Sequence, residues 1–426
     1  MGFIRVTVIT FAAVFIFTST AFAQPAEEWR QFRGPGGQGV STSKGVPTKW
    51  SATDNVRWKT ALPGSGTSGP IVVGKHIYLT AHTGYGVDRG SAGNMDDLKR
   101  HLLCLNLADG KILWTRDIES KLPEEPYVNR IHWHSYASST PASDGSTIVT
   151  FFGKTGVIAF DLAGKKLWQA DVGSKVHGWG SAASPVIHKN LVFINASVES
   201  ESLVALDLKT GEEKWRVNGI KESWNTPVLV EVPGGQTELI FADQGRVLGY
   251  DPATGKELWR CKGIEYYIVP SLVVFDGAVF CTGGRNYVSL AVKAGGRGEV
   301  SNTHVLWRGN KGSNVTSAVY HAGHIYWAHD SQPTVYCADA KTGETKYADR
   351  VPGRLENFYA SATLADGRIY YLDRAGNTVI VAAKPELEII ATNSLGREAG
   401  VTNTNIVVAG KNLLIRSEKF LFCIGE

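Results

Sequence analysis

Cysteine is scarce in this sequence, with five among 426 residues. None of the five belongs to a C-x-x-C pair, which excludes the usual zinc-ribbon, thioredoxin-like and haem-attachment patterns. Cys104, Cys337 and Cys423 occupy matching positions in three related segments, where a small apolar residue suits a buried strand. We therefore expect free thiols and no disulfide framework.

A large net charge is also absent. Lysine and arginine number 44 against 40 for aspartate and glutamate, which gives a formal net charge of +4. This balance provides no electrostatic reason to expect nucleic acid or an anionic membrane as a partner. The Gly-x-Ser-x-Gly motif of a hydrolase nucleophile is missing too. The usual signatures of several enzyme and nucleic-acid-binding classes are thus not present.

Long apolar runs are confined to the N-terminus. Residues 6–17 form an apolar stretch after Arg5, and Ala21-Phe22-Ala23 follows as a cleavage signal. The stretch is short for a membrane span, and no cysteine follows it for lipid attachment. We predict a signal peptide over residues 1–23, a periplasmic or secreted location and no membrane span after cleavage. An uncleaved anchor is the alternative.

Glycine and tryptophan, in contrast, are abundant, with 47 and 12 residues. They recur in a repeat whose copies align by eye, which is the signature of a repeat architecture. Two further, more divergent copies end at Trp307 and near Ile390. The clearest copies cover residues 103–114, 158–168, 204–215, 248–259 and 335–347.

The chemistry of one repeat indicates a β-hairpin. An apolar strand ends at Asp207, whose side chain can bond the backbone two residues on and start a turn. Gly211 supplies the positive φ that a tight turn needs. The second strand carries Trp215, and a large ring that recurs once per repeat suits a filler between sheets. We therefore expect the repeated tryptophans to be structural.

Each such hairpin is preceded by another, which begins near a serine, threonine or proline. Two hairpins make four antiparallel strands, which is one blade of a β-propeller. Eight such starts occur, but the last blade has only three strands before the C-terminus. Residues 55–60, with Trp58 in the repeated tryptophan position, supply the missing outer strand. We predict an all-β, eight-bladed propeller over residues 51–426, closed by this strand and preceded by an extension over residues 24–50.

The Asp-x-x-Thr-Gly-x-x-x-Trp repeats closely resemble those of the pyrroloquinoline-quinone (PQQ)-like β-propeller family, which includes quinoprotein dehydrogenases and the outer-membrane assembly factor BamB. Residues 29–40 and 55–59 look like the start of secreted PQQ-binding-like repeat proteins. The resemblance implies an eight-bladed propeller. Many quinoprotein dehydrogenases place adjacent cysteines against the cofactor, and this chain has no such pair. It has no evident Glu/Asn/Asp calcium cluster either, so we do not expect PQQ with calcium.

Three functions remain open. The first is a non-catalytic ligand- or protein-binding scaffold, which the complete repeat frame without a recognisable catalytic constellation favours. The second is a PQQ-dependent oxidoreductase of the quinoprotein type. The third is a carbohydrate-binding or carbohydrate-active protein, for which aromatic and asparagine side chains are suited. The expected partners are a small polar ligand, a glycan or an envelope protein, and we expect a monomer.

Any ligand should bind at the mouth of the central channel, where loops of different sequence meet. His132 and His134 have the i, i+2 spacing of residues on one face of a strand, but without a third ligand we expect no metal site. The insertion over residues 82–100 is either a lid or surface decoration. The predicted ligand-binding residues are His132, His134, Trp179, Trp224, Arg285, Asp330, Asn357 and Arg374.

Overall fold

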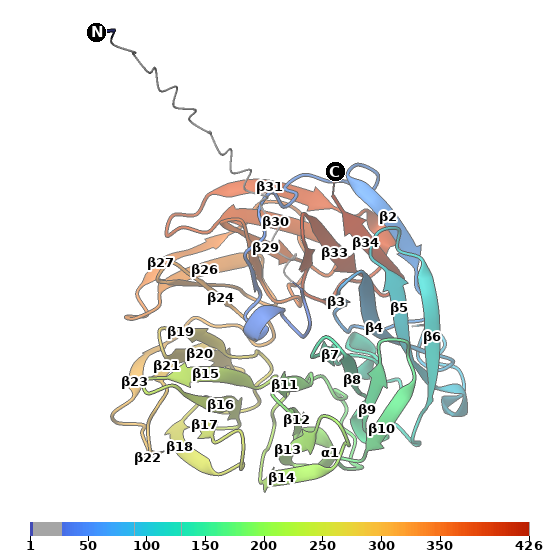
Figure 1. The fold of residues 1–426 in the computed structure, drawn as a ribbon, viewed down its shortest axis with the longest axis horizontal. Coiled ribbons are helices and arrows are strands. Elements are labelled where there is room, and N and C mark those ends of the chain that lie inside the picture. The colour runs from blue at the N-terminus through green and yellow to red at the C-terminus, as the bar shows by residue number, and fades with distance from the viewer. Residues whose placement is uncertain (3–27, 89, 129, 426) are drawn as a thin grey trace.

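The computed structural model describes residues 1–2, 28–88, 90–128 and 130–425. The predicted signal peptide lies outside them except for its first two residues. Eight β-sheets surround one axis, with the first strand of each sheet innermost and the last at the rim (Figure 1). The prediction of an eight-bladed propeller is therefore confirmed. Among the described residues, no helix is long and apolar enough to cross a membrane.

Four strands, A to D from the axis outward, make each blade. Blade 1 is β3 (Ile71–Val73), β4 (His76–Thr83), β5 (Lys99–Asn106) and β6 (Ile112–Glu119). Blade 2 is β7 (Ala142–Ser143), β8 (Thr147–Phe151), β9 (Val157–Asp161) and β10 (Lys166–Ala170). Blade 3 is β11 (Val186–His188), β12 (Leu191–Ala196), β13 (Ser202–Asp207) and β14 (Glu213–Asn218). Blade 4 is β15 (Val228–Val232), β16 (Gln236–Asp243), β17 (Arg246–Tyr250) and β18 (Glu257–Lys262), with β22 (Gly298–Glu299) added outside.

The second half of the ring repeats this plan. Blade 5 is β19 (Val273–Phe275), β20 (Ala278–Gly283), β21 (Val288–Lys293) and β23 (Val305–Gly309). Blade 6 is β24 (Val319–His321), β25 (His324–Ala328), β26 (Thr334–Asp339) and β27 (Thr345–Arg350). Blade 7 is β28 (Thr363–Ala365), β29 (Arg368–Leu372), β30 (Asn377–Ala382) and β31 (Ile389–Ser394), with β1 (Val40–Ser41) added inside. Blade 8 is β32 (Val407–Ala409), β33 (Asn412–Arg416), β34 (Phe420–Ile424) and, from the N-terminal part, β2 (Val56–Ala61).

Helical turns are short. The loops contain η1 (Pro35–Gly37), η2 (Met95–Asp97), η3 (Ile131–Trp133), η4 (Gly153–Thr155), η5 (Arg397–Ala399) and the single α-helical turn α1 (Ser197–Ser200). The predicted closure is confirmed, because β2 pairs antiparallel with β34 and brings Trp58 opposite Cys423. This pairing removes an open sheet edge, which an incomplete ring would expose.

Neighbouring blades are joined by the repeated tryptophans. Trp168 of blade 2 donates a hydrogen bond from Nε1 to the carbonyl oxygen of Leu208 in blade 3 at 2.9 Å. Its ring covers Gly211, where an added Cβ would come within 2.5 Å of the indole. The equivalent indoles in other blades that donate to the next blade are Trp58, Trp215 and Trp307. These tryptophans are therefore structural, as predicted.

Trp259 differs from these tryptophans. It is fully buried and turns back onto its own blade, where its Nε1 donates to Glu238 Oε2 at 2.7 Å. Glu238 is buried as well and forms an ion pair with Arg297 at 2.9 Å. Arg297 lies in the glycine-rich insertion that carries β22, so this insertion replaces the usual tryptophan contact between blades 4 and 5.

A belt of hydrogen bonds surrounds the axis. The backbone N–H of Gly69 in blade 1 donates to Thr140 Oγ1 in blade 2 at 2.8 Å. From blade 2 as far as blade 7, the equivalent backbone N–H of each blade donates to a serine or threonine hydroxyl of the next blade, at donor–acceptor distances of 3.0 Å or less. We call the residues at this register the lower layer: Gly69, Thr140, Ser184, Thr226, Ser271, Ser317, Ser361 and Asn405.

The N-terminal extension closes one end of the channel. We call residues 29–41 the plug, and Figure 1 shows its η1 turn near the axis. Phe32 of the plug lines the channel from below. Arg33 is fully buried and donates to the carbonyl oxygen of Ala318 in blade 6, while β1 pairs parallel with β28. The face with the plug is the plug face, and the opposite one is the mouth face.

The insertion in blade 1 lengthens β4 and β5 and then packs against another long loop. Tyr85 and Leu98 form a small apolar cluster with Ile131 and Tyr136. The Tyr85 hydroxyl accepts a hydrogen bond from the backbone N–H of Tyr127 at 2.8 Å. The insertion therefore supports the loop over residues 120–136, which carries η3 to the mouth face.

Candidate functional site

Two layers of side chains line the channel, and the repeat dictates their register. Residues two positions before the lower layer point toward the same side of each innermost strand, because side chains alternate along a strand. This upper layer differs from blade to blade, whereas the lower layer is mostly serine and threonine. The upper layer consists of Thr67, Ser138, Ala182, Trp224, Val269, Val315, Tyr359 and Asn403.

The upper layer forms the floor of a pocket at the channel mouth. Its volume is about 530 Å³, open space at its mouth included. Trp224 lies perpendicular to Tyr267, with ring centroids 6.4 Å apart, and its Nε1 donates to the carbonyl oxygen of Gly180 at 2.8 Å. Six blades contribute to the lining, which consists of His134, Trp179, Ala182, Trp224, Tyr267, Val269, Asn314, Val315, Asp330 and Tyr359.

Polar groups occupy one wall of this mouth pocket. Asp330 is buried, and its Oδ1 accepts hydrogen bonds from the backbone N–H of Asn314 at 2.8 Å and from Ser313 Oγ at 3.2 Å. Asn314 Nδ2 donates to the Tyr267 hydroxyl at 2.9 Å. Asn314 Oδ1 is buried without a hydrogen-bond partner among the described residues. The wall therefore presents oxygen acceptors to a ligand that carries donors.

Another wall comes from a contact between parts of the ring that are distant in sequence. Trp133, from the supported loop, stacks on Tyr359 of blade 7 with centroids 5.7 Å apart and planes inclined by 22°. The Arg374 guanidinium lies 4.2 Å from the Trp133 ring centroid and 4.8 Å from that of Tyr359. Asn403 Nδ2 donates to the carbonyl oxygen of Trp133 at 2.8 Å. The loop is thus held across the mouth.

His134 lies at the end of the same loop. Its ring meets Trp179 edge-on at 5.3 Å. Burial, together with the positive charge of Arg374, lowers the pKa of His134 to about 4, so the imidazole is neutral at pH 7. A neutral imidazole offers one donor and one acceptor, which suits a polar, uncharged group of a ligand.

Five of the eight predicted residues lie at the mouth pocket, and the other three lie outside its lining. His134, Trp179, Trp224 and Asp330 line the pocket, and Arg374 supports its aromatic wall. Three predicted residues, His132, Arg285 and Asn357, are not among the residues that line it. Arg285 is exposed and lies over Tyr266, with 6.0 Å between its guanidinium carbon and the ring centroid.

The expected strand-like spacing of His132 and His134 is wrong. His132 lies inside the 3-10 turn η3, and His134 ends that turn with φ −119° and ψ −37°. A 3-10 turn does not alternate its side chains as a strand does. His132 contacts the rings of Tyr127 and Trp133 and is not part of the pocket lining.

Six residues of the mouth-pocket lining are absent from the predicted set, namely Ala182, Tyr267, Val269, Asn314, Val315 and Tyr359. A usable signal exists for Tyr359, because it stands two positions before Ser361 of the lower layer. When the eight innermost strands are aligned on their lower-layer residues, the residues two positions earlier in the sequence are the upper layer. Tyr267 and Asn314 lie in loops that precede the strands, where no such register applies.

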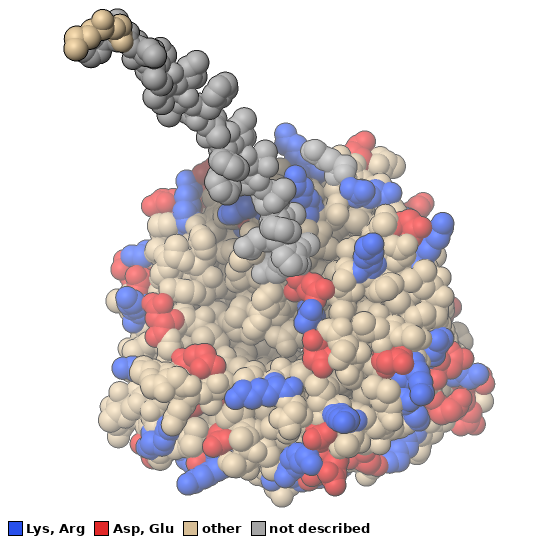
Figure 2. Space-filling view, viewed as in Figure 1, with Lys and Arg blue, Asp and Glu red and all other residues tan. Residues whose placement is uncertain are grey.

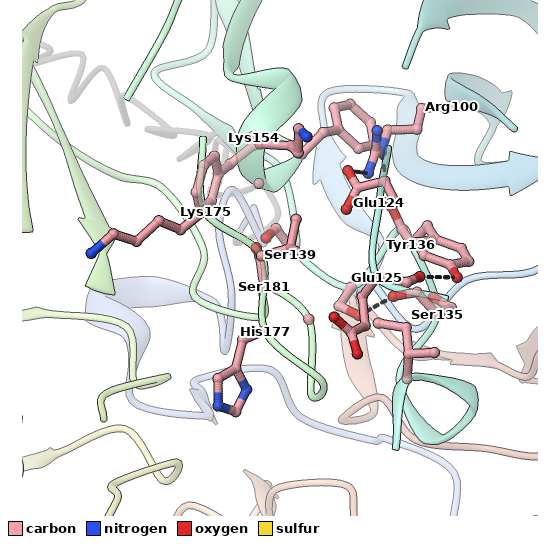
Figure 3. A pocket seen from close by; sticks show the side chains of 17 residues that line it. Arg100, Glu124, Glu125, Ser135, Tyr136, Ser139, Lys154, Lys175, His177 and Ser181 are labelled. Carbon is pink, nitrogen blue, oxygen red and sulfur yellow. Dashed lines mark hydrogen bonds and ion pairs between the residues drawn. The ribbon is translucent and has the colours of Figure 1, made fainter. Parts of the chain in front are cut away.

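A second pocket of about 410 Å³ lies off the axis, between blades 2 and 3 (Figure 3). Four of the five Lys, Arg and Glu side chains that line it are engaged within the protein. Arg100 pairs with Glu124, Lys154 donates to the carbonyl oxygen of Pro123 at 2.6 Å, and Lys175 pairs with Glu201 at 2.8 Å, whereas the fifth is Glu125. Ser181 lines it and donates to Glu199 behind the wall. Burial raises the pKa of Glu199 to about 7. This pocket offers few free groups to a ligand.

The described residues contain no group of three or more histidine, cysteine, aspartate or glutamate side chains placed to hold a metal ion. All five cysteines are free and buried, including Cys104, Cys337 and Cys423 at the matching repeat positions.

Comparisons with known proteins agree with this architecture. The family model described as outer membrane protein assembly factor BamB matches residues 99–349. A search of curated protein sequences gives no match. Among solved structures, BamB from Moraxella catarrhalis is 14% identical, with a TM-score of 0.58 over 86% of this chain and 97% of that one.

Two quinoprotein-type enzymes are similar in fold. Quinohemoprotein alcohol dehydrogenase from Comamonas testosteroni is 11% identical, with a TM-score of 0.64 over 93% of this chain and 80% of that one. A europium-containing methanol dehydrogenase is 12% identical, with a TM-score of 0.62 over 92% and 90%. At sequence identities this low, the similarity establishes the fold but not the function. The family match and the eight blades together show that this chain belongs to the PQQ-like, BamB-type β-propeller family.

Proposed function

We propose that the chain is a non-catalytic binding propeller, periplasmic or secreted, whose mouth pocket holds a polar organic ligand. The observation that carries this proposal is a pocket to which six blades contribute different side chains on a repeated frame. Variable residues on a repeated scaffold are where recognition resides in such folds. The predicted signal peptide and the family's description as an outer-membrane assembly factor support the location.

The chemistry of the pocket restricts its ligand. Trp179, Trp224 and Tyr267 offer flat aromatic faces, which favour a ligand with a planar or apolar face. Asp330 and Asn314 offer oxygen acceptors beside those faces, which favour hydroxyl, amine or amide donors on the ligand. A sugar and an organic amine both satisfy this description, the amine through an additional cation–π interaction.

The alternative of a PQQ-dependent oxidoreductase has less support. Calcium prefers six to eight oxygen ligands with several carboxylates. Asp330 is the one carboxylate in the described lining of the mouth pocket, and its Oδ1 already accepts two hydrogen bonds. These residues do not fit a calcium-bound quinone, so we derive no redox step from them.

The experiment is a binding comparison on the mature protein. Thermal shift and calorimetry would be measured with PQQ plus calcium, with a set of oligosaccharides and with aromatic and quaternary amines. Asp330→Asn and Trp224→Ala should each weaken binding of the compound found by about tenfold or more, and Arg285→Ala, outside the pocket, should leave it unchanged. Dye-linked dehydrogenase activity after PQQ and calcium loading would overturn the proposal. Equal binding by all three variants would overturn the site.

A further inference from the structure

The plug is held by the innermost strands through one repeated contact. The backbone N–H of Val72 in blade 1 donates to the carbonyl oxygen of Trp29 at 2.9 Å. The N–H of Ser143 in blade 2 donates to the carbonyl oxygen of Arg30 at 2.8 Å. Each donor stands three residues after its blade's lower-layer residue, where the N–H points away from the sheet and toward the axis.

Two more blades use the same position. The N–H of Val274 in blade 5 donates to Gln38 Oε1 at 2.7 Å. The N–H of Leu364 in blade 7 donates to the carbonyl oxygen of Gly39 at 2.7 Å. The plug thus supplies one oxygen acceptor to the inner strand edge of each of four blades. An unpaired strand edge is a ready template for an extended chain.

Blades 3 and 4 carry the same position without a plug acceptor. Ile187 stands three residues after Ser184, and Leu229 stands three residues after Thr226. Ile187 pairs with Val192 in the register in which Val72 pairs with Ile77, so its N–H also points away from the sheet. Among the described residues, no plug oxygen accepts a hydrogen bond from the N–H of Ile187 or of Leu229.

Instead, both strand edges face a groove on the plug face. Its volume is about 640 Å³, open space included. Pro185, Ile187, Pro227 and Leu229 form its blade side, Phe32 and Gly37 belong to its plug side, and no charged residue lines it. Figure 2, drawn in the view of Figure 1, shows that tan residues predominate around the middle of this face, with some charged side chains there and more toward the rim.

We propose that this groove binds an extended, uncharged peptide segment of a partner protein. Backbone carbonyl oxygens of the peptide accept hydrogen bonds from Ile187 and Leu229, and its apolar side chains cover the two prolines and Phe32. The plug is the precedent, because it is an extended segment that already satisfies four equivalent strand edges and borders the groove directly. The lack of charged residues in the lining disfavours a charged peptide, which would lose its hydration without compensation.

This site is separate from the mouth pocket. Phe32 borders both the channel and the groove, but the linings of the groove and of the mouth pocket have no residue in common. The proposal therefore stands or fails independently of the ligand at the mouth.

The test selects peptides from a random peptide display library on the mature protein. Proline on an edge strand is tolerated where its N–H does not serve the sheet, so the double variant Ile187→Pro/Leu229→Pro removes only the proposed donors. Leu229→Glu keeps the backbone and places a charge in the groove. The matched control, Leu306→Glu, places the same charge on exposed strand β23 at the rim.

We expect the enriched peptides to lack charged residues. Compared with the native protein, the proline variant and Leu229→Glu should bind these peptides about tenfold or more weakly, and Leu306→Glu should bind them equally well. Hydrogen exchange gives a second readout that needs no variant. The amides of Ile187 and Leu229 should exchange quickly in the free protein and slowly with the peptide, while those of Val72 and Val274 stay slow in both. Failure to enrich peptides, unchanged affinity of the Leu229→Glu variant, or protection at the mouth instead would overturn the proposal.

Discussion

The Nε1 of Trp168 and the carbonyl oxygen of Leu208 form a 2.9 Å hydrogen bond that joins two blades, and the indole covers Gly211 in the same turn. A tryptophan and a glycine of successive repeats therefore fit each other as a pair. The glycine is required twice, once for its φ of +75° and once for the space that the ring occupies.

Gly211→Ala should accordingly destabilise the ring by more than backbone strain alone. The strain of alanine at positive φ costs on the order of 1 kcal/mol, and overpacking against Trp168 adds roughly 1–3 kcal/mol. Gly245→Ala is the matched control, because Gly245 has φ +82° and open space around its Cβ position. Urea denaturation of both variants measures the difference, and equal losses would contradict the paired contact.

Trp259→Ala should be more damaging than Trp215→Ala. Trp259 is fully buried and its removal also takes a donor from buried Glu238, so we expect a loss of about 3–5 kcal/mol. Trp215 is only half-buried, so Trp215→Ala should lower the free energy of unfolding by less. Trp259→Phe, which keeps a ring without the donor, separates packing from hydrogen bonding. Calorimetric unfolding tests the order, and a reversed order would show that Trp259 is not the stronger anchor.

Removing residues 55–60 should destabilise the entire ring. This deletion takes away nearly all of β2, exposes the edge of β34 and breaks the 3.2 Å bond from Trp58 Nε1 to the carbonyl oxygen of Leu107 in blade 1. A lower melting temperature and concentration-dependent aggregation are expected, by scanning calorimetry and light scattering. An unchanged melting temperature without aggregation would show that the ring does not depend on this closure.

Glu199→Gln should remove a pH-dependent loss of stability. The folded-state pKa of Glu199 is about 7, above its ordinary value of 4.5, because burial penalises the carboxylate. Between pH 4.5 and 7 the folded protein therefore holds a proton on Glu199 that the unfolded chain has lost. The contribution of Glu199 to the free energy of unfolding is fully present below pH 4.5 and is lost as the pH rises through 7. The loss amounts to roughly 3 kcal/mol.

We therefore expect Glu199→Gln to be more stable than the native protein at pH 8 and nearly equal to it at pH 4, by denaturant unfolding. Glu201→Gln is the control. The hydrogen bond from Lys175 lowers the pKa of partly exposed Glu201, so the change in stability with pH has the opposite sign for this residue. A Glu199→Gln variant that shows no gain at pH 8 would indicate that the carboxylate ionises freely in the fold.

The eight blades, the closing strand and the structural tryptophans were predictable from the sequence. Each blade contacts mainly its neighbours, so the same local solution recurs and leaves a repeated pattern, as in the turn from Asp207 to Gly211. The structure places predicted residues in the mouth-pocket lining where the repeat extends into the loops, as for Trp224. It leaves Arg285 outside the lining, in a loop without a repeated register, where Arg285 is exposed and lies over Tyr266.

The sequence by itself determined the repeat and therefore the ring, the hydrogen-bonded lower layer and the alternation of side chains that places the upper layer two residues before it. Only the tertiary structure decided what closes each end of the channel. Trp133 meets Tyr359, and Phe32 reaches the axis, through segments that occur once and have no repeated counterpart. Their positions depend on packing between residues far apart in the chain, which no local pattern encodes.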